Sequence, residues 1–389
     1  MKPHDPFPAL AELRFQRPDQ SAFATELREQ AQAYLHARGD HRAADGRELA
    51  KGCALLAACV VTAYGALCAN GIWAFAACYV AFVLLVALLA VNFMHIASHG
   101  AVWGRADGRR ARTLRWHRAV MRFVTLPLGI EPEYWAIRHV NYHHAYPNIE
   151  HYDLDTEENV LLRQTPFQPW YPHQRFQYLY WPLIAALSMP YIGWVHDWSD
   201  RLGKTVLASD RALPGWQGCL LFAGTKLAHF VFMLALPIWA AQRSGIGWAE
   251  VLAVYWLAQL CASYFVVVLL LGTHWAGAEF FLPSPNGAMT HTWYEHTMRT
   301  SVDWQPWPRW LGFWMGGLHR HLTHHLFPTW HPRHYDALGC IVERLARKHG
   351  LPYRELGHLE VFRAQFRFLK EMGRQPGASP KAKVDRPQR

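Results

Sequence analysis

The chain has 389 residues, a formal net charge of +10 at pH 7 and 24 histidines. Hydrophobic residues make up 51% and charged residues only 17%, whereas soluble domains carry about 25% charged residues. This composition excludes a disordered protein. The positive charge would suit nucleic acid, an anionic membrane surface or an acidic protein partner. No nucleic-acid-binding motif accompanies it, and the basic residues flank apolar runs, so we expect a membrane and no nucleic acid as partner.

The first 50 residues are polar and are predicted to form a cytoplasmic lead-in, with residues 22–36 as its best helical stretch. From Gly52 to Met94 no residue is charged. One membrane-spanning helix needs about 20 apolar residues, so this run predicts two spans, at about 53–70 and 72–94. A tight turn is predicted between them at Asn70-Gly71. A soluble helical hairpin is the alternative, but soluble helices almost always carry a polar face.

Two further spans are predicted in the second half of the chain. The segment at about 218–240 is apolar apart from Lys226 and His229. Lys226 lies near its start, where a lysine can extend to the membrane interface, and we interpret His229 as a packed polar residue. The segment at about 250–273 carries no charged residue after Glu250 and predicts the fourth span.

The distribution of lysine and arginine predicts the topology. Both are frequent before the first span, between the second and third, and after the fourth, whereas the connection at 241–249 carries only Arg243. This bias places both termini and the long polar segments in the cytoplasm. A weaker apolar segment at about 178–194 contains two prolines and is expected to lie along the interface. The predicted fold is an all-α integral membrane protein with four transmembrane helices and a cytoplasmic helical cap, in a bacterial inner membrane.

Three histidine boxes follow or precede the predicted spans: HIASH, HVNYHH and HLTHH. Residues three or four positions apart share a helix face, so His139 and His143 should point the same way, with His144 about a hundred degrees round. Eight imidazoles gathered without metal would repel one another when protonated or leave buried nitrogens unsatisfied. The boxes therefore predict a metal centre built from His95, His99, His139, His143, His144, His321, His324 and His325.

The number and type of these ligands favour iron. Zinc needs three or four ligands and often uses cysteine, and haem needs one or two axial ligands. Eight histidines from separate segments suit two octahedral-leaning ions. Few carboxylates lie nearby, unlike the soluble di-iron bundles that use Glu and Glu-x-x-His.

The order of these motifs resembles the membrane-bound fatty acid desaturase family, in particular its bacterial front-end and linoleoyl-CoA-desaturase-like members. The resemblance rests on HIASH, HVNYHHAYPN, two spans and then HLTHHLFP. It extends to Trp135–His139 and to Gly316-Gly317-Leu318, and it covers roughly residues 50–355. We expect a desaturase domain at 51–371, followed by a disordered basic tail at 372–389.

The resemblance implies one more ligand and several supporting residues. His274, the first polar group after the last apolar run, matches a further metal ligand of the family. His296 and His319 are possible residues of the surrounding shell. Asp153 and Asp155 either accept the second imidazole proton of a ligand or cap the turn that follows them.

The chain also departs from the family pattern. Front-end members usually have Asn where His319 stands and Gln where His321 stands, and many have Asp where Ile96 stands. These departures leave open which carbon is attacked. We expect His331 and His334, just past the third box, at the surface.

By resemblance the substrate is a long acyl chain on CoA, a carrier protein or a membrane lipid. Two iron ions would activate dioxygen, the co-substrate, and the protein would position the chain. No HPGG motif of a fused cytochrome b5 domain is present, so a separate donor is expected, either ferredoxin or cytochrome b5 with its reductase. A hydroxylase of lipids, alkanes or carotenoids on the same scaffold, and a membrane metal-binding or transport protein, are the alternatives.

Overall fold

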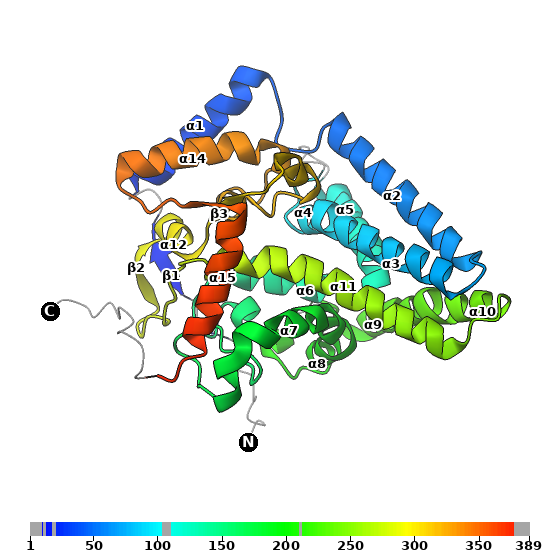
Figure 1. Cartoon of the computed structure of the whole chain (residues 1–389). Helices are drawn as coiled ribbons and strands as arrows, with labels where there is room; N and C mark the ends of the chain where they lie inside the picture. Colours follow the sequence, from blue (N-terminus) through cyan, green and yellow to red (C-terminus); the bar gives the residue numbers. More distant parts are fainter. Residues whose placement is uncertain (1–9, 11–12, 18–20, 103–109, 210–211, 377–389) are drawn as a thin grey trace.

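The structure is a computed structural model that describes residues 10, 13–17, 21–102, 110–209 and 212–376. It is mostly helical, as the sequence predicts (Figure 1). The final helix ends at Met372, and most of the predicted disordered tail, from residue 377 onward, lies outside the described residues.

Four helical stretches in the described part of the chain are long and apolar enough to cross a membrane. The second, third and fourth start within three residues of their predicted positions, the first starts seven residues earlier than predicted, and the turn at Asn70-Gly71 joins the first two. They are α2 (Gly46–Leu67); α3 (Ile72–Leu89) with η2 (Ala90–Met94) and α4 (His95–Ser98); α9 (Gly215–Phe230) with η9 (Val231–Ala235) and α10 (Leu236–Gln242); and α11 (Trp248–Trp275).

The stretch between the second and third spans is a series of short helices, described with its gaps at 103–109 and 210–211. Its elements are α5 (Arg110–Thr125), η3 (Leu126–Leu128), α6 (Pro132–Ala136), η4 (Ile137–His143), η5 (Leu154–Thr156), η6 (Pro172–Phe176), α7 (Gln177–Tyr191), η7 (Ile192–His196), α8 (Asp197–Arg201) and η8 (Val206–Ser209).

A second polar region, which we call the cap, consists of the described residues before the first span and after the fourth span. In Figure 1 it lies to the left, and the turn between α2 and α3 lies far to the right. Its elements are β1 (Arg14–Gln16), α1 (Ala22–Arg38), β2 (Ala288–Thr292), α12 (Trp293–Thr300), β3 (Asp303–Gln305), η10 (Arg309–Trp314), α13 (His321–Leu326), η11 (Pro332–His334), α14 (Tyr335–His349), β4 (Glu355–Gly357) and α15 (His358–Met372).

The cap has its own hydrophobic core. Helix α1 begins at the predicted position because the Ser21 hydroxyl accepts a hydrogen bond from the Ala24 amide, a typical N-cap. The buried face of α1, including Leu27, packs against α14, including Leu338, and α14 in turn packs against α13. Helix α1 therefore belongs to the same hydrophobic core as the helix that carries the third histidine box. Two short parallel strand pairs, β1 with β2 and β3 with β4, complete the cap.

Helix α7 corresponds to the segment expected along the interface. One face packs on α11, and the opposite face exposes Leu179, Leu183, Leu187 and Tyr191 at four-residue spacing. Such an apolar stripe suits the boundary between headgroups and acyl chains. The position of α7 along the membrane interface stays a prediction.

Lys226 in the third span is not extended into solvent but is held by polar groups of the connecting stretch. Its ammonium lies 2.6 Å from the Asp197 carboxylate and donates to the carbonyl oxygens of Gly129 and Gly193. Burial raises the pKa of Asp197 to about 7 against the opposing effect of Lys226. The pair ties α8 and the η3–α6 turn to the third span.

We expect Lys226→Met to lower the unfolding free energy by about 3–5 kcal/mol, because it leaves the Asp197 carboxylate buried and unpaired. The thermal unfolding midpoint of the detergent-purified protein measures this loss. Lys204→Met, at an exposed lysine, is the matched control. Recovery in Lys226→Met/Asp197→Leu would attribute the loss to the unpaired charge, and equal midpoints for Lys226→Met and wild type would contradict it.

Candidate metal centre

The predicted metal ligands come from four parts of the chain and meet between the spans and the cap. Box one lies on α4 and the residue after it, and box two on η4 and the residue after it. Box three lies on α13, and His274 lies in the last turn of α11. Eight of these nine histidines are buried, and His99 is half-buried.

The nine side chains form two groups, in each of which the nitrogens that could bind a metal lie within 4.8 Å of one another. The first group takes two residues from box one, two from box two and one from box three. The second takes one from box two, two from box three and the α11 residue. Their members are His95, His99, His139, His144 and His324, and His143, His274, His321 and His325.

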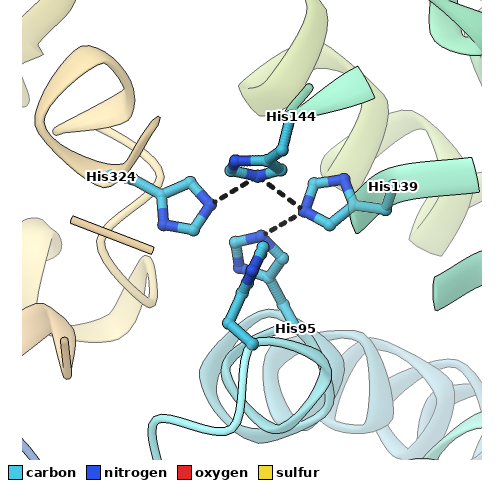
Figure 2. A group of neighbouring side chains, drawn as sticks. His95, His139, His144 and His324 are labelled. Carbon is cyan, nitrogen blue, oxygen red and sulfur yellow. Dashed lines mark hydrogen bonds between the residues drawn. The ribbon is translucent and has the colours of Figure 1, made fainter. Parts of the chain in front are cut away.

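The imidazole Nε2 atoms of four members of the first group converge (Figure 2). His139 Nε2 lies 2.9 Å from His95 Nε2 and 3.1 Å from His144 Nε2, which in turn lies 3.1 Å from His324 Nε2. In the second group, His321 Nε2 lies 2.8 Å from His274 Nε2 and 3.2 Å from His325 Nε2. Figure 2 shows the rings of four first-group histidines, His95, His139, His144 and His324, turned inward toward one another.

These separations fit a shared metal ion. With metal–imidazole distances of about 2.1 Å, neighbouring ligands of an octahedral ion are about 3.0 Å apart. Hydrogen bonding alone explains the contacts poorly, because one Nε2 proton cannot serve two neighbouring nitrogens at once. The two groups also adjoin, since the His144 and His325 rings stack with centroids 4.1 Å apart. The arrangement could therefore hold two ions side by side.

Outer partners fix the orientation of several imidazoles. His274 Nδ1 lies 3.0 Å from the Thr300 carbonyl oxygen, to which it can only donate. His143 Nδ1 lies 3.0 Å from the Asp153 carboxylate, and His324 Nδ1 lies 2.9 Å from the Tyr335 hydroxyl. A proton held on Nδ1 leaves the Nε2 lone pair of His274 and His143 free for a metal.

Asp153 fills both roles that the sequence left open. One of its oxygens accepts from His143 and from the Asp155 amide, which caps the η5 turn. The other accepts from the Asn148 amide, at 2.8 Å. The Asp155 carboxylate lies farther from His143 Nδ1, at 3.5 Å, and is 41% exposed. Asp153 is thus the buried partner of His143, and Asp155 the outer one.

The electrostatics keep most of the cluster neutral. Burial holds the pKa values of His139, His144, His321, His324 and His325 well below the ordinary value. His143 differs: burial lowers its pKa, but Asp153 and Asp155 outweigh burial and raise it to about 9. Neutral imidazoles with inward lone pairs are the form that binds a metal.

The loop before the third box reaches the cluster through two glycines. Gly316 has φ +56°, and a Cβ there would lie 2.2 Å from the Val91 carbonyl oxygen. Gly317 has φ +82°, and a Cβ there would lie 2.7 Å from Pro332. A left-handed backbone in such close contact requires glycine, which explains the Gly-Gly pair noted in the sequence.

Other histidines lie outside both groups. His296 is buried. Its Nδ1 lies 2.9 Å from His291 Nε2, and its Nε2 lies 2.7 Å from the Pro147 carbonyl oxygen, so it supports the loop after the second box. His319 is buried beside a separate cavity described below. His229 is a packed polar residue, as predicted, between the Leu126 carbonyl and the Tyr255 hydroxyl.

Some predictions about neighbouring residues were wrong. His331 and His334 were expected at the surface, but each is only 1% exposed, because η11 packs beneath the lead-in. Thr300 and Tyr335, which contact the imidazoles of His274 and His324, were not predicted. No local motif marks them, since each contact depends on the tertiary fold.

Comparison with known proteins identifies relatives of this chain. A family model described as "Fatty acid desaturase" matches residues 70–357. An acyl-lipid (8-3)-desaturase of Physcomitrium patens is 26% identical over 77% of this chain and 64% of its own length. An sn-1 linoleoyl-lipid 6-desaturase of Synechocystis is 26% identical over 75% of this chain and 79% of its own length. Fatty acid desaturase 3 of Bos taurus is 28% identical over 67% of this chain. This chain thus spans under two thirds of the moss protein.

Proposed function

The chain belongs to the fatty acid desaturase family, and from this membership we propose that it introduces a double bond into a long acyl chain, using dioxygen and two external electrons. The single observation that carries the proposal is the pair of inward-facing histidine groups, five and four in number, between the spans and the cap. We propose that all nine histidines are metal ligands and that the two ions are iron. When bound, the iron pair would supply the oxidising power that removes hydrogen from an unactivated methylene.

The task of the protein's own side chains is to hold the ligands in one geometry. Asp153 and the Thr300 carbonyl keep protons on the outer nitrogens of His143 and His274, which leaves the inner nitrogens free. The second group has one histidine fewer than the first. We therefore propose that an exogenous ligand would bind at the second group, where fewer side chains would hold the ion, because catalytic metal sites keep a position free of protein ligands.

The acyl chain requires an apolar space that opens to the bilayer. A groove of about 490 Å³ lies between α2, α3, η3 and η9. Its lining is apolar or aromatic, and its one phenol, Tyr79, donates to the Met233 carbonyl instead of facing the groove as a free donor. The groove contains none of the nine histidines, so we assign it to a lipid chain beside the spans and not to the reacting carbons.

The proposal includes a separate electron donor and a cytoplasmic active site. Two of the relatives named above act on acyl lipids or linoleoyl lipids according to their names, which favours a membrane lipid over a soluble thioester as acyl carrier. The positive net charge suits an acidic donor at the polar face.

The proposed function is tested by expressing the wild type and His143→Ala in a host that lacks polyunsaturated acyl chains, with oxygen and a donor system. Acyl chains are then profiled by mass spectrometry. We expect a new species lacking two hydrogens in the wild type only. A new species that gains one oxygen would assign the protein as a hydroxylase instead of a desaturase. Identical acyl profiles in the two strains, despite iron-loaded protein and several electron donors, would contradict both assignments.

A further inference from the structure

A second cavity, of about 570 Å³, lies on the outer side of the metal centre, between the start of α2, η10 and the α13–α14 region. Its wall includes Tyr335, whose hydroxyl contacts His324, and Ile96, which follows a predicted ligand. None of the nine histidines lines it. The cavity is thus next to the centre but separate from it.

The lining of this cavity, which we call the basic cavity, is rich in cations. Five basic side chains face two acidic ones, Glu48 and Asp336. Three of the cations form ion pairs. Lys51 pairs with Glu48, at 2.6 Å. Arg320 pairs with Asp336, at 2.9 Å, and Arg333 pairs with Asp40, at 2.7 Å.

The remaining two cations, Arg47 and Arg309, are exposed and have no ion pair among the described residues. Arg47 lies in the first turn of α2, with its guanidinium 4.7 Å from the centre of the Phe313 ring. Arg309 begins η10, the helix that carries Phe313. Two free guanidinium groups therefore flank the cavity from two elements, an arrangement that suits an anion with several oxygen acceptors.

A buried histidine adds an unused donor. His331 lines the cavity and is 1% exposed. Its Nδ1 accepts from the Arg333 amide, at 3.3 Å, so the ring proton lies on Nε2. That Nε2 is buried and has no hydrogen-bond partner within the described part of the chain. A buried donor without a partner is costly unless a ligand or water satisfies it.

The surroundings place the basic cavity at a membrane surface. Arg47 lies at the start of the first candidate span. Trp307 and Trp310, beside Arg309, are 77% and 63% exposed. Exposed tryptophans next to arginines are typical of the headgroup level of a bilayer, where the phosphates of lipids lie.

We propose that the basic cavity binds the phosphate of an anionic phospholipid headgroup, with Arg47 and Arg309 as its charged contacts and His331 Nε2 as a further donor. The site would hold a lipid of the surrounding leaflet against the outer wall of the metal centre. Binding of this phospholipid requires no catalytic turnover, so it can be tested independently of the desaturase activity.

The test measures lipid binding to the purified full-length chain by native mass spectrometry. The probes are dioleoylphosphatidylglycerol and a monogalactosyl diacylglycerol, which has no phosphate. We expect the wild type to bind the phospholipid at least about tenfold more tightly than the glycolipid. Arg47→Gln/Arg309→Gln should lose this preference, and Arg47→Lys/Arg309→Lys should keep most of it.

Arg363→Gln/Arg367→Gln is the matched control, because it removes the same charge from two exposed positions on α15. It should bind the phospholipid within about twofold of the wild type. Equal binding of both lipids, or equal loss in both glutamine variants, would overturn the proposal. Coenzyme A and inorganic phosphate are tested as competitors. If either binds more tightly than the phospholipid and displaces it, the proposal that the bound phosphate belongs to a lipid is wrong.

Discussion

Replacing His321 with alanine is expected to abolish double-bond formation and to lower bound iron from about two ions per chain to about one. The second group has only four histidines, and His321 Nε2 contacts two of the others, at 2.8 and 3.2 Å. Its loss leaves three imidazoles for that ion, whereas loss of His99 leaves four in the first group. We therefore expect His99→Ala to retain more iron than His321→Ala.

Iron content by elemental mass spectrometry and product yield by lipid analysis measure this difference. His36→Ala is the control, because His36 is an exposed histidine of α1 far from either group in the chain. It should keep the iron content and yield of the wild type. The two-group arrangement is wrong if His321→Ala retains both ions, or if His36→Ala loses iron to the same extent.

Asp153→Asn is expected to weaken iron binding by about 10–100-fold while the fold persists. An asparagine oxygen can still accept from His143, but its amide nitrogen would face the Asn148 amide, which now donates to the second carboxylate oxygen at 2.8 Å. The side chain would therefore lose its fixed orientation, and His143 with it. Asp155→Asn should have a smaller effect, because that carboxylate is 41% exposed and lies 3.5 Å from His143.

The same substitution should change how iron affinity depends on pH. Asp153 and Asp155 raise the pKa of His143 to about 9 in the metal-free protein, against the lowering effect of burial. Below that pKa the His143 imidazole is charged, and iron must displace its Nε2 proton. Iron affinity should therefore increase with pH by up to about tenfold per pH unit below pH 9. Removing the Asp153 charge lowers the pKa and should flatten this dependence between pH 7 and 9. Anaerobic iron titrations at several pH values measure it, and an unchanged slope would contradict the role of Asp153.

The sequence was sufficient to predict the spans because their signal is local. Long apolar runs, one of them containing Lys226, predicted the four helices, and the Asn70-Gly71 turn lies where it was expected. The orientation in the membrane and the interfacial position of α7 stay predictions. Neither depends on a contact within the chain.

The sequence did not predict how the histidines divide between the two groups. On an α-helix His139 and His143 share a face, but η4 is a widened π-helical turn, in which the His144 amide bonds to the His139 carbonyl five residues earlier. His139 therefore groups with His144, and His143 joins the other group. π-Helical turns are frequent at functional sites, but no local sequence signal announces one.

The most direct test of the account is the iron content of the wild-type protein after anaerobic reconstitution with ferrous iron, combined with X-ray absorption at the iron edge. The account predicts about two iron ions per chain, each with nitrogen or oxygen neighbours at about 2.1 Å and no sulfur. One ion per chain, or iron that washes out equally from the wild type and His321→Ala, would contradict a two-ion centre held by the nine histidines.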